Sequence, residues 1–134
     1  MERLILDTGA LIALERAEPT ADPVSDDSDD VAIAAITAAE LLVGVELAGT
    51  AHHQSRLRFV EGVLQRVQIL AFDLAVARHH AILLGHARRT GRPRGAHDLQ
   101  IAATARASER IVITTDQSAF SDLPSVAFRV LGAA

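Results

Sequence analysis

Apolar residues fall into two kinds of stretch that alternate along the chain. Short runs are apolar at consecutive positions, as strands buried on both faces of a sheet are. Longer stretches repeat their apolar positions every three or four residues, which predicts amphipathic helices. Strands are therefore expected at residues 3–6, 31–36, 68–72, 110–115 and 126–130. Helices are expected at residues 8–17, 37–49, 52–67, 73–91 and 97–109.

Strands that alternate with helices predict the α/β class: a mostly parallel central sheet with helices on both faces, in three α/β/α layers. The 134 residues suit a single domain spanning 1–134. Asp73 precedes the fourth expected helix and is its expected N-cap. Residues 18–30 hold two prolines and the acidic run 25–30, which predicts a solvated loop. The alternative for this run is a surface that mimics nucleic acid or binds an Arg-rich partner segment.

Composition removes several kinds of chemistry. The chain has no Cys and no Lys, and its 13 basic residues, all Arg, face 17 acidic ones for a net charge of −4. These absences exclude disulfides, thiolate metal sites, a thiol nucleophile, a P-loop lysine and a Schiff base. The apolar region 31–45 is interrupted by Thr37 and Glu40, so we expect no membrane segment, and the cytoplasm is the expected compartment.

Four acidic residues are expected at the same edge of the sheet. Asp7 and Asp116 each follow a strand, Glu40 lies in the first turn of a predicted helix, and Asp98 opens another. Ligands of parallel α/β sheets bind beyond the carboxyl ends of the strands. Each acid also has a structural interpretation: Asp7 as a helix cap, Thr37 to Glu40 as a capping box, Asp98 at a helix dipole and Asp116 in a turn.

Convergence of four carboxylates would carry an electrostatic cost. Two carboxylates about 4 Å apart repel by roughly 4 kcal/mol at an effective dielectric near 20. A hard divalent cation, Mg²⁺ or Mn²⁺, is the usual partner of an all-oxygen set of ligands. Such ions activate water for attack on phosphorus, a reaction that needs neither Cys nor Lys. The hypothesis from the residues is a metal-dependent hydrolase of phosphodiester bonds.

The chain resembles PIN-domain ribonucleases of the VapC toxin type in four blocks that occur in the order and at the spacing of the family, and the resemblance extends over essentially the whole chain. The matching blocks are LILDTGALIAL (4–14), ITAAELLVGV (36–45), GAHDLQIAATA (95–105) and IVITTDQSAF (111–120). The resemblance implies a strand order of about 3-2-1-4-5, RNA cleavage with one or two Mg²⁺ or Mn²⁺ ions, a homodimer, and neutralisation by a VapB-type antitoxin. It places the catalytic and metal-binding acids on Asp7, Glu40, Asp98 and Asp116, with Thr8 and Thr115 as supporting hydroxyls.

The chain departs from the family at one position of the fourth block. Many relatives carry a further acid just before its Phe, where this chain has Ala119. A second metal ion would therefore have one acidic ligand fewer. Asp122 could replace this missing ligand only if its loop folds back. With four acids at the site, 13 others balance the 13 Arg residues, so the net charge does not exclude an RNA substrate.

Several basic and imidazole side chains have two interpretations each. Contact with RNA phosphates is one interpretation of an arginine cluster just before the Asp98 block, and a solvated helix end is the other. The cluster consists of Arg88, Arg89, Arg92 and Arg94. The pairs at 52–53 and 79–80 are expected to be surface histidines. His97 is expected to be a polar residue of the helix start, with a substrate-facing side chain as the alternative.

Two other functions compete with the nuclease hypothesis. Residues 6–10 read LDTGA, the active-site loop of retroviral-type aspartic peptidases, which are small homodimers. That fold is all-β, whereas most of this chain has helical periodicity. The second competitor is a catalytically inactive PIN-like module that only binds partners; such a module is expected to have lost some of the four acids.

Overall fold

Five short strands form one sheet, described together with the helices by a computed structural model of residues 1–16 and 28–132. Every strand pairing is parallel, and the order is β3-β2-β1-β4-β5, which confirms the expected 3-2-1-4-5. β1 lies in the centre, where Leu4 pairs with Val31 on one side and Ile111 on the other. The strands are β1 (Arg3–Leu6), β2 (Asp30–Ala34), β3 (Gln68–Leu70), β4 (Ile111–Thr114) and β5 (Phe128–Val130).

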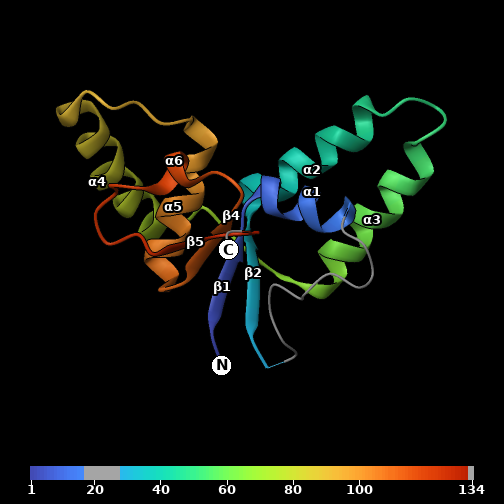
Figure 1. Cartoon of the computed structure of the whole chain (residues 1–134), viewed down its shortest axis with the longest axis horizontal. Coiled ribbons are helices and arrows are strands. Elements are labelled where there is room, and N and C mark those ends of the chain that lie inside the picture. Colours follow the sequence, from blue (N-terminus) through green and yellow to red (C-terminus); the bar gives the residue numbers. More distant parts are fainter. Residues whose placement is uncertain (17–27, 133–134) are drawn as a thin grey trace.

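Helices cover both faces of the sheet and separate into two arms (Figure 1). One arm holds α1 (Thr8–Arg16), α2 (Ala35–Leu47) and α3 (His53–Arg66). The other holds α4 (Leu74–Thr90), α5 (Ala96–Ser108) and the short α6 (Gln117–Phe120). Along β1, Leu4 and Leu6 pack under the first arm and Ile5 under the second. Because neighbouring strand residues face opposite sides, β1, β2 and β4 each supply both halves of the core.

The architecture is the predicted three-layer α/β/α fold, and it rules out the all-β aspartic peptidase. In that class of protein the LDTGA loop joins strands of a β-barrel, whereas here Leu6 ends a parallel strand and Thr8 begins a helix. Among the described residues, no helix combines the length and apolar character needed to cross a bilayer.

The boundary between β2 and α2 differs from the prediction. The apolar run was expected to stay extended through residue 36, but β2 ends at Ala34 and α2 begins at Ala35. Ala34 is itself the N-cap, with an extended backbone (φ −76°, ψ 153°) and no side-chain cap bond, so the strand passes straight into the helix. The proposed capping box is therefore wrong: Thr37 lies inside α2, fully buried, and Glu40 lies beyond the first turn.

The other boundaries move by one or two residues at most. β3 and β5 are shorter than expected because only three residues of each pair with a neighbouring strand. The Asp73 cap is confirmed, since its carboxylate accepts a hydrogen bond of 3.0 Å from the Val76 amide. Helix α6 was not expected, because four residues are too few to show a period.

The acidic run 25–30 is only partly a loop. Residues 25–27 lie outside the described residues, so the interpretation of this run as a solvated loop is tested only at its end. Asp30 is the first residue of β2, opposite Arg3 of β1, which contradicts its placement in the loop. The physical reason is a buried arginine, Arg110, whose guanidinium needs an anion at this edge of the sheet.

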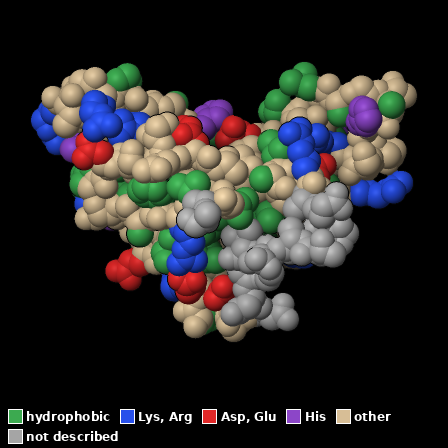
Figure 2. All heavy atoms as spheres, in the orientation of Figure 1, with side chains coloured by type: hydrophobic (Ala, Val, Ile, Leu, Met, Phe, Trp, Pro, Cys, Tyr) green, Lys and Arg blue, Asp and Glu red, His purple; other side chains and the backbone are tan. Residues whose placement is uncertain are grey.

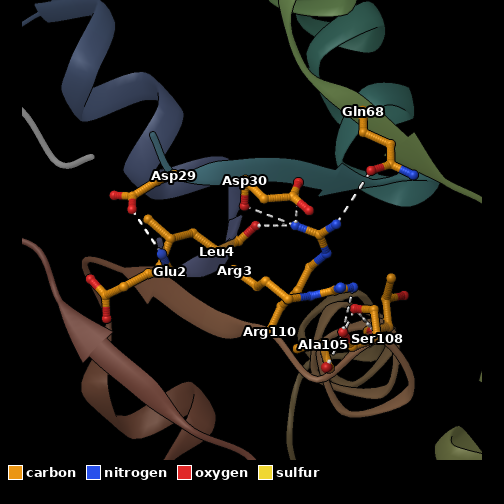
Figure 3. A network of polar contacts seen from close by, with 10 residues as sticks. Glu2, Arg3, Leu4, Asp29, Asp30, Gln68, Ala105, Ser108 and Arg110 are labelled. Carbon is orange, nitrogen blue, oxygen red and sulfur yellow. Dashed lines mark hydrogen bonds and ion pairs between the residues drawn. The ribbon is translucent and has the colours of Figure 1, made fainter. Parts of the chain in front are cut away.

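Arg110 joins the amino ends of three strands (Figure 3). Its Nη1 donates to the Leu4 carbonyl (3.2 Å), the Asp30 carbonyl (2.9 Å) and Asp30 Oδ1 (3.0 Å). Its Nη2 donates to Gln68 Oε1 at 3.3 Å. The guanidinium holds the pKa of Asp30 below its ordinary value, chiefly through the hydrogen bond and further through its charge. This edge of the sheet is therefore electrostatically compensated.

Replacing Arg110 tests how much this network stabilises the fold. We expect Arg110→Met to lower the free energy of unfolding by about 2–4 kcal/mol, because the buried carbonyls lose their donor and Asp30 loses its counter-charge. Urea unfolding followed by circular dichroism measures the change. Arg129→Met is the control, since the Arg129–Glu2 pair is about half exposed and is expected to contribute less than about 1 kcal/mol. Equal losses in both variants would contradict the assignment.

Candidate active site

Acidic side chains gather at the floor of the notch between the two arms, together with a histidine (Figure 2). This floor is the carboxyl edge of the parallel sheet, where ligands of such sheets bind. Asp7 follows β1, Glu40 lies on α2, Asp98 lies in the first turn of α5 and Asp116 follows β4. The structure thus brings together the four acids named from the sequence, from four separate segments. Their role in catalysis stays a prediction at this point.

Asp7 is the most buried of the four, with 6% of its surface exposed. Its Oδ1 accepts a hydrogen bond of 2.8 Å from the Ala10 amide, so the helix-cap interpretation is correct as well. Its Oδ2 accepts a hydrogen bond from the Thr114 hydroxyl. Burial raises the pKa of Asp7 above its ordinary value, and the charges of Asp116 and Glu40 raise it further, while the two hydrogen bonds oppose the rise.

Glu40 contacts polar side chains of two other helices. The Thr8 hydroxyl donates to Oε1 at 2.9 Å, which agrees with the supporting position expected for Thr8. His97 Nδ1 lies 3.3 Å from Oε2. From the sequence, His97 was expected to be only a polar residue of the helix start. Its position next to Asp98 was the available signal, but only the folded chain shows that it reaches Glu40.

Asp98 experiences the combined charge of the other three acids. Burial raises the pKa of its carboxyl above the ordinary value, and the charges of Asp7, Asp116 and Glu40 raise it further, whereas His97 lowers it. The backbone before α5 passes very close: a Cβ at Gly95 would lie 3.0 Å from Asp98 Oδ2. The position of the Asp98 carboxylate therefore depends on a glycine that leaves it room.

Asp116 is exposed and is the N-cap of α6. Its Oδ1 accepts hydrogen bonds from the Ser118 hydroxyl (2.6 Å) and the Ser118 amide (3.0 Å). The hydroxyl bond is the main reason that the pKa of Asp116 lies below its ordinary value. This carboxylate therefore stays ionised, while Asp7 and Asp98 hold their protons more readily.

A further hydroxyl at the site belongs to Thr114, which was not singled out from the sequence, and the supporting role expected for Thr115 stays a prediction. Thr114 is fully buried and donates to Asp7, whereas Thr115 is exposed. The two side chains differ because neighbouring residues of an extended segment point to opposite sides, and the TTD sequence does not tell which one turns toward Asp7. Thr115 Oγ1 instead lies against Gly9, where an added Cβ would come within 2.7 Å of it.

Asp122 does not replace the acid that is absent at position 119. Ala119 is a buried residue of α6, and Asp122 forms an ion pair with Arg92 (2.5 Å). The Asp122 carbonyl also lies 3.0 Å from His86 Nε2 of α4, which holds its loop toward that helix. Asp122 is not among the charges that shift the pKa of Asp7 or Asp98.

The arginine cluster divides into two pairs with different surroundings. Arg92 is paired with Asp122, and Arg94 donates to the carbonyls of Ser121 (2.6 Å) and Arg92 (3.0 Å). Both therefore hold the loop before α5 against the segment after α6. Arg88 and Arg89 lie exposed in the last turn of α4. Within the described residues, no hydrogen bond or ion pair of the Arg88 or Arg89 side chain is found, whereas Arg92 and Arg94 both have partners.

The acids suit a hard divalent cation in chemistry, although their side chains are not yet arranged as a cage. Within the described residues, no three acidic or histidine side chains already surround one point as metal ligands would. Asp7, Glu40 and Asp116 instead accept hydrogen bonds from their own neighbours, as charges that repel one another do. A carboxylate oxygen has two lone pairs, so these bonds leave acceptor capacity. The pKa values of Asp7 and Asp98 are raised chiefly by burial and further by neighbouring negative charges, and a cation would offset that repulsion.

Comparison with known proteins identifies the class of this fold and site. The family model of the PIN domain matches residues 4–125, so the chain belongs to the PIN domain family. The relatives found are VapC ribonucleases. A tRNA(fMet)-specific endonuclease VapC from Shigella flexneri is 28% identical over 122 residues, 90% of this chain and 91% of the relative. A ribonuclease VapC from Rickettsia bellii is 30% identical over 124 residues, 92% of each chain.

Solved structures agree over nearly the whole length. A chain of VapBC-5 from Mycobacterium tuberculosis, a member of the VapBC family of toxin-antitoxin systems, has a TM-score of 0.77 and is 31% identical. The match covers 97% of this chain and 98% of that one. A chain of DNA-bound VapBC from Salmonella typhimurium has a TM-score of 0.82 at 24% identity, with the same coverage, and shows a shared fold.

Replacement of Asp98 by a neutral amide is expected to stabilise the protein, because the pKa of its carboxyl is raised. A carboxyl with a raised pKa favours folding most below its ordinary pKa, and this contribution is lost as the pH rises through the raised value. In chelator, Asp98→Asn is therefore expected to raise the Tm by a few degrees at neutral pH, and the gain should vanish near pH 4. Thermal unfolding at a series of pH values measures it.

Asp116→Asn is the matched comparison for that experiment. The pKa of Asp116 is lowered by the Ser118 bonds, so the ionised carboxylate stabilises the folded state. Its replacement is expected to lower the Tm at neutral pH, with a smaller loss as the pH falls below the ordinary pKa. A stabilising Asp116→Asn, or an Asp98→Asn that destabilises at neutral pH, would show that the charges are not distributed as described.

Proposed function

We propose that this chain is a metal-dependent endoribonuclease toxin that is neutralised by a VapB-type antitoxin. The observation that carries the proposal is the meeting of four carboxylates from four segments at the carboxyl edge of the sheet, with the pKa of two of them raised partly by mutual charge. Relatives over nearly the full length are named as VapC ribonucleases, and similar solved structures are VapBC complexes. The proposed site of action is the cytoplasm, where such an RNA substrate is present.

Asp7, Glu40, Asp98 and Asp116 would hold Mg²⁺ or Mn²⁺. The ion supplies a water of lowered pKa and neutralises charge on the phosphodiester. Asp7 is fixed on both oxygens by Ala10 and Thr114, which orients it without freedom to turn away. Asp116 brings a carboxylate that is ionised before any cation arrives. Attack of water on phosphorus would leave a 5′-phosphate and a 3′-hydroxyl, with no covalent intermediate on the protein.

The proposal favours an active enzyme over an inactive partner-binding module. A module that had lost catalysis would have no need to keep Asp7 and Asp98, whose raised pKa values mean that their ionised forms destabilise the fold at neutral pH. All four are present, and the charges of neighbouring acids contribute to the raised pKa of Asp7 and of Asp98. Whether one ion or two bind is open to measurement; the apolar, buried Ala119 supplies no ligand for a second. A homodimer remains a prediction from the family.

Two exposed arginines at the end of α4 are the proposed RNA contacts. Arg88 and Arg89 sit in the last turn of α4 with their side chains exposed, whereas Arg92 and Arg94 are engaged within the protein. Guanidinium groups bind phosphate oxygens in a bidentate manner. The four arginines named from the sequence therefore divide into two that can bind phosphates and two that hold a loop.

Amide variants of the acids test the catalytic assignment. Asp7→Asn, Glu40→Gln and Asp98→Asn are each expected to reduce RNA cleavage by more than about 100-fold, because loss of a metal ligand should exceed the 10- to 100-fold effect of its supporting residues. Cleavage of total RNA in Mg²⁺ or Mn²⁺ measures this, with circular dichroism to check the fold. Chelator should abolish wild-type cleavage, and added ion should restore it.

Asp122→Asn is the control for that set, because Asp122 lies near the same motif but is paired with Arg92. It is expected to leave cleavage within a few-fold of wild type. Cleavage by Asp98→Asn at the wild-type rate, or full wild-type cleavage in chelator, would refute the proposed metal-dependent mechanism.

The salt dependence of RNA binding tests the arginine assignment. In an Asp98→Asn background, which keeps the RNA intact, Arg88→Ala with Arg89→Ala is expected to lower the slope of log affinity against log salt by about 0.7 for each phosphate that is no longer bound. Arg58→Ala with Arg66→Ala, two exposed positions on α3, removes the same charge and should change the slope less. Equal changes in the two pairs would indicate an effect of net charge only.

A further inference from the structure

One polar contact crosses the floor of the notch from arm to arm. His97 Nδ1 lies 3.3 Å from Glu40 Oε2. Glu40 belongs to α2 of the first arm, and His97 is the second residue of α5 in the other (Figure 1). The imidazole is about half exposed, with 52% of its side-chain surface accessible, and it directly precedes Asp98. The contact therefore lies within the proposed metal centre, although His97 is not one of the four acids.

Glu40 needs such a contact more than the other acids do. Asp7 is a short side chain fixed by a backbone amide and a buried hydroxyl, and Asp116 is fixed by both donors of Ser118. Glu40 has one more rotatable bond, and ordering such a side chain costs rotamer entropy. Its Oε1 is held by the Thr8 hydroxyl at 2.9 Å, a donor from its own arm.

We propose that His97 is a positioning residue that holds Glu40 across the notch through an Nδ1–H hydrogen bond. The inference rests on the proposed function and adds to it a residue outside the four acids. A neutral imidazole is sufficient, because it donates from one nitrogen. The two bonds to Glu40, one on each oxygen, leave lone pairs on both for a cation. His97 also fixes the distance between α2 and α5, which carry Glu40 and Asp98 respectively.

The two ring nitrogens of His97 can be tested separately, because Asn and Gln each replace a different one of them. Among the described residues, His97 Nε2 has no hydrogen-bond partner, so it is the nitrogen that a bound substrate would meet. Asn places an amide N–H close to the position of Nδ1, whereas Gln places one close to Nε2. If His97 positions Glu40, the His97→Asn variant is expected to retain its role and the His97→Gln variant is not.

Metal affinity gives the first measurement, independent of turnover. Mn²⁺ titration by calorimetry is expected to show about 10- to 100-fold weaker binding in His97→Ala and His97→Gln, the range found for residues that support metal ligands. His97→Asn should stay within a few-fold of wild type. In a Glu40→Ala background, His97→Ala should have no further effect, because the residue acts through Glu40. RNA cleavage should follow the same order.

Two outcomes overturn the positioning role. If Gln preserves cleavage and Asn does not, His97 acts on the substrate through Nε2. If His97→Ala weakens Mn²⁺ binding equally with and without Glu40, the two residues act independently. Unchanged Mn²⁺ affinity in His97→Ala overturns it as well.

NMR shows which ring nitrogen of His97 carries the proton, and this measurement needs neither metal nor RNA. Long-range ¹H–¹⁵N spectra of the wild-type protein, at a pH where the imidazole is neutral, are expected to show the proton of His97 on Nδ1. In Glu40→Ala it should shift toward Nε2. A wild-type ring protonated on Nε2 refutes the proposed bond. If the protein neither binds Mn²⁺ nor cleaves RNA, the proposed function fails, and this spectrum still decides the His97–Glu40 contact.

Discussion

A buried carboxylate at the end of the central strand is the constraint around which this protein is organised. Asp7 is 6% exposed, and three other acids act at the same edge of the sheet. Its two oxygens are occupied by the amide of α1 and the hydroxyl of β4, so the charge is tied to one helix and one neighbouring strand. The site and the core therefore meet at one side chain: the bonds that satisfy Asp7 also join β1, α1 and β4.

Among the described residues, the charged side chains are compensated by opposite charges at one edge of the sheet and not at the other. At the amino edge, Arg110 is compensated by Asp30 and by carbonyls of two strands, and the pKa of Asp30 is lowered. At the carboxyl edge the acids have no arginine among the contacts described, and the pKa values of Asp7 and Asp98 are raised. The first arrangement stabilises the fold, whereas the ionised forms of Asp7 and Asp98 cost stability.

Particular residues show why sequence reasoning succeeded in some places and failed in others. Asp7, Asp98 and Asp116 each adjoin the end of a strand or the start of a helix, and in a parallel sheet such positions meet at one edge. Thr114 and Thr115 are alike in sequence, and only the direction of each side chain separates them. Arg92 and Arg94 resemble phosphate ligands until the segment after α6 is seen to accept their hydrogen bonds.

The sequence by itself determined the class of fold, the strand order through its family resemblance, and the set of four acids. It could do so because periodicity, strand-helix alternation and the chemistry of carboxylates are local properties that follow directly from the order of the residues. Only the tertiary structure decided where α2 begins, which threonine reaches Asp7, and that His97 meets Glu40 across the notch. These depend on contacts between residues far apart in the chain, and a pattern along the chain carries no distance between them.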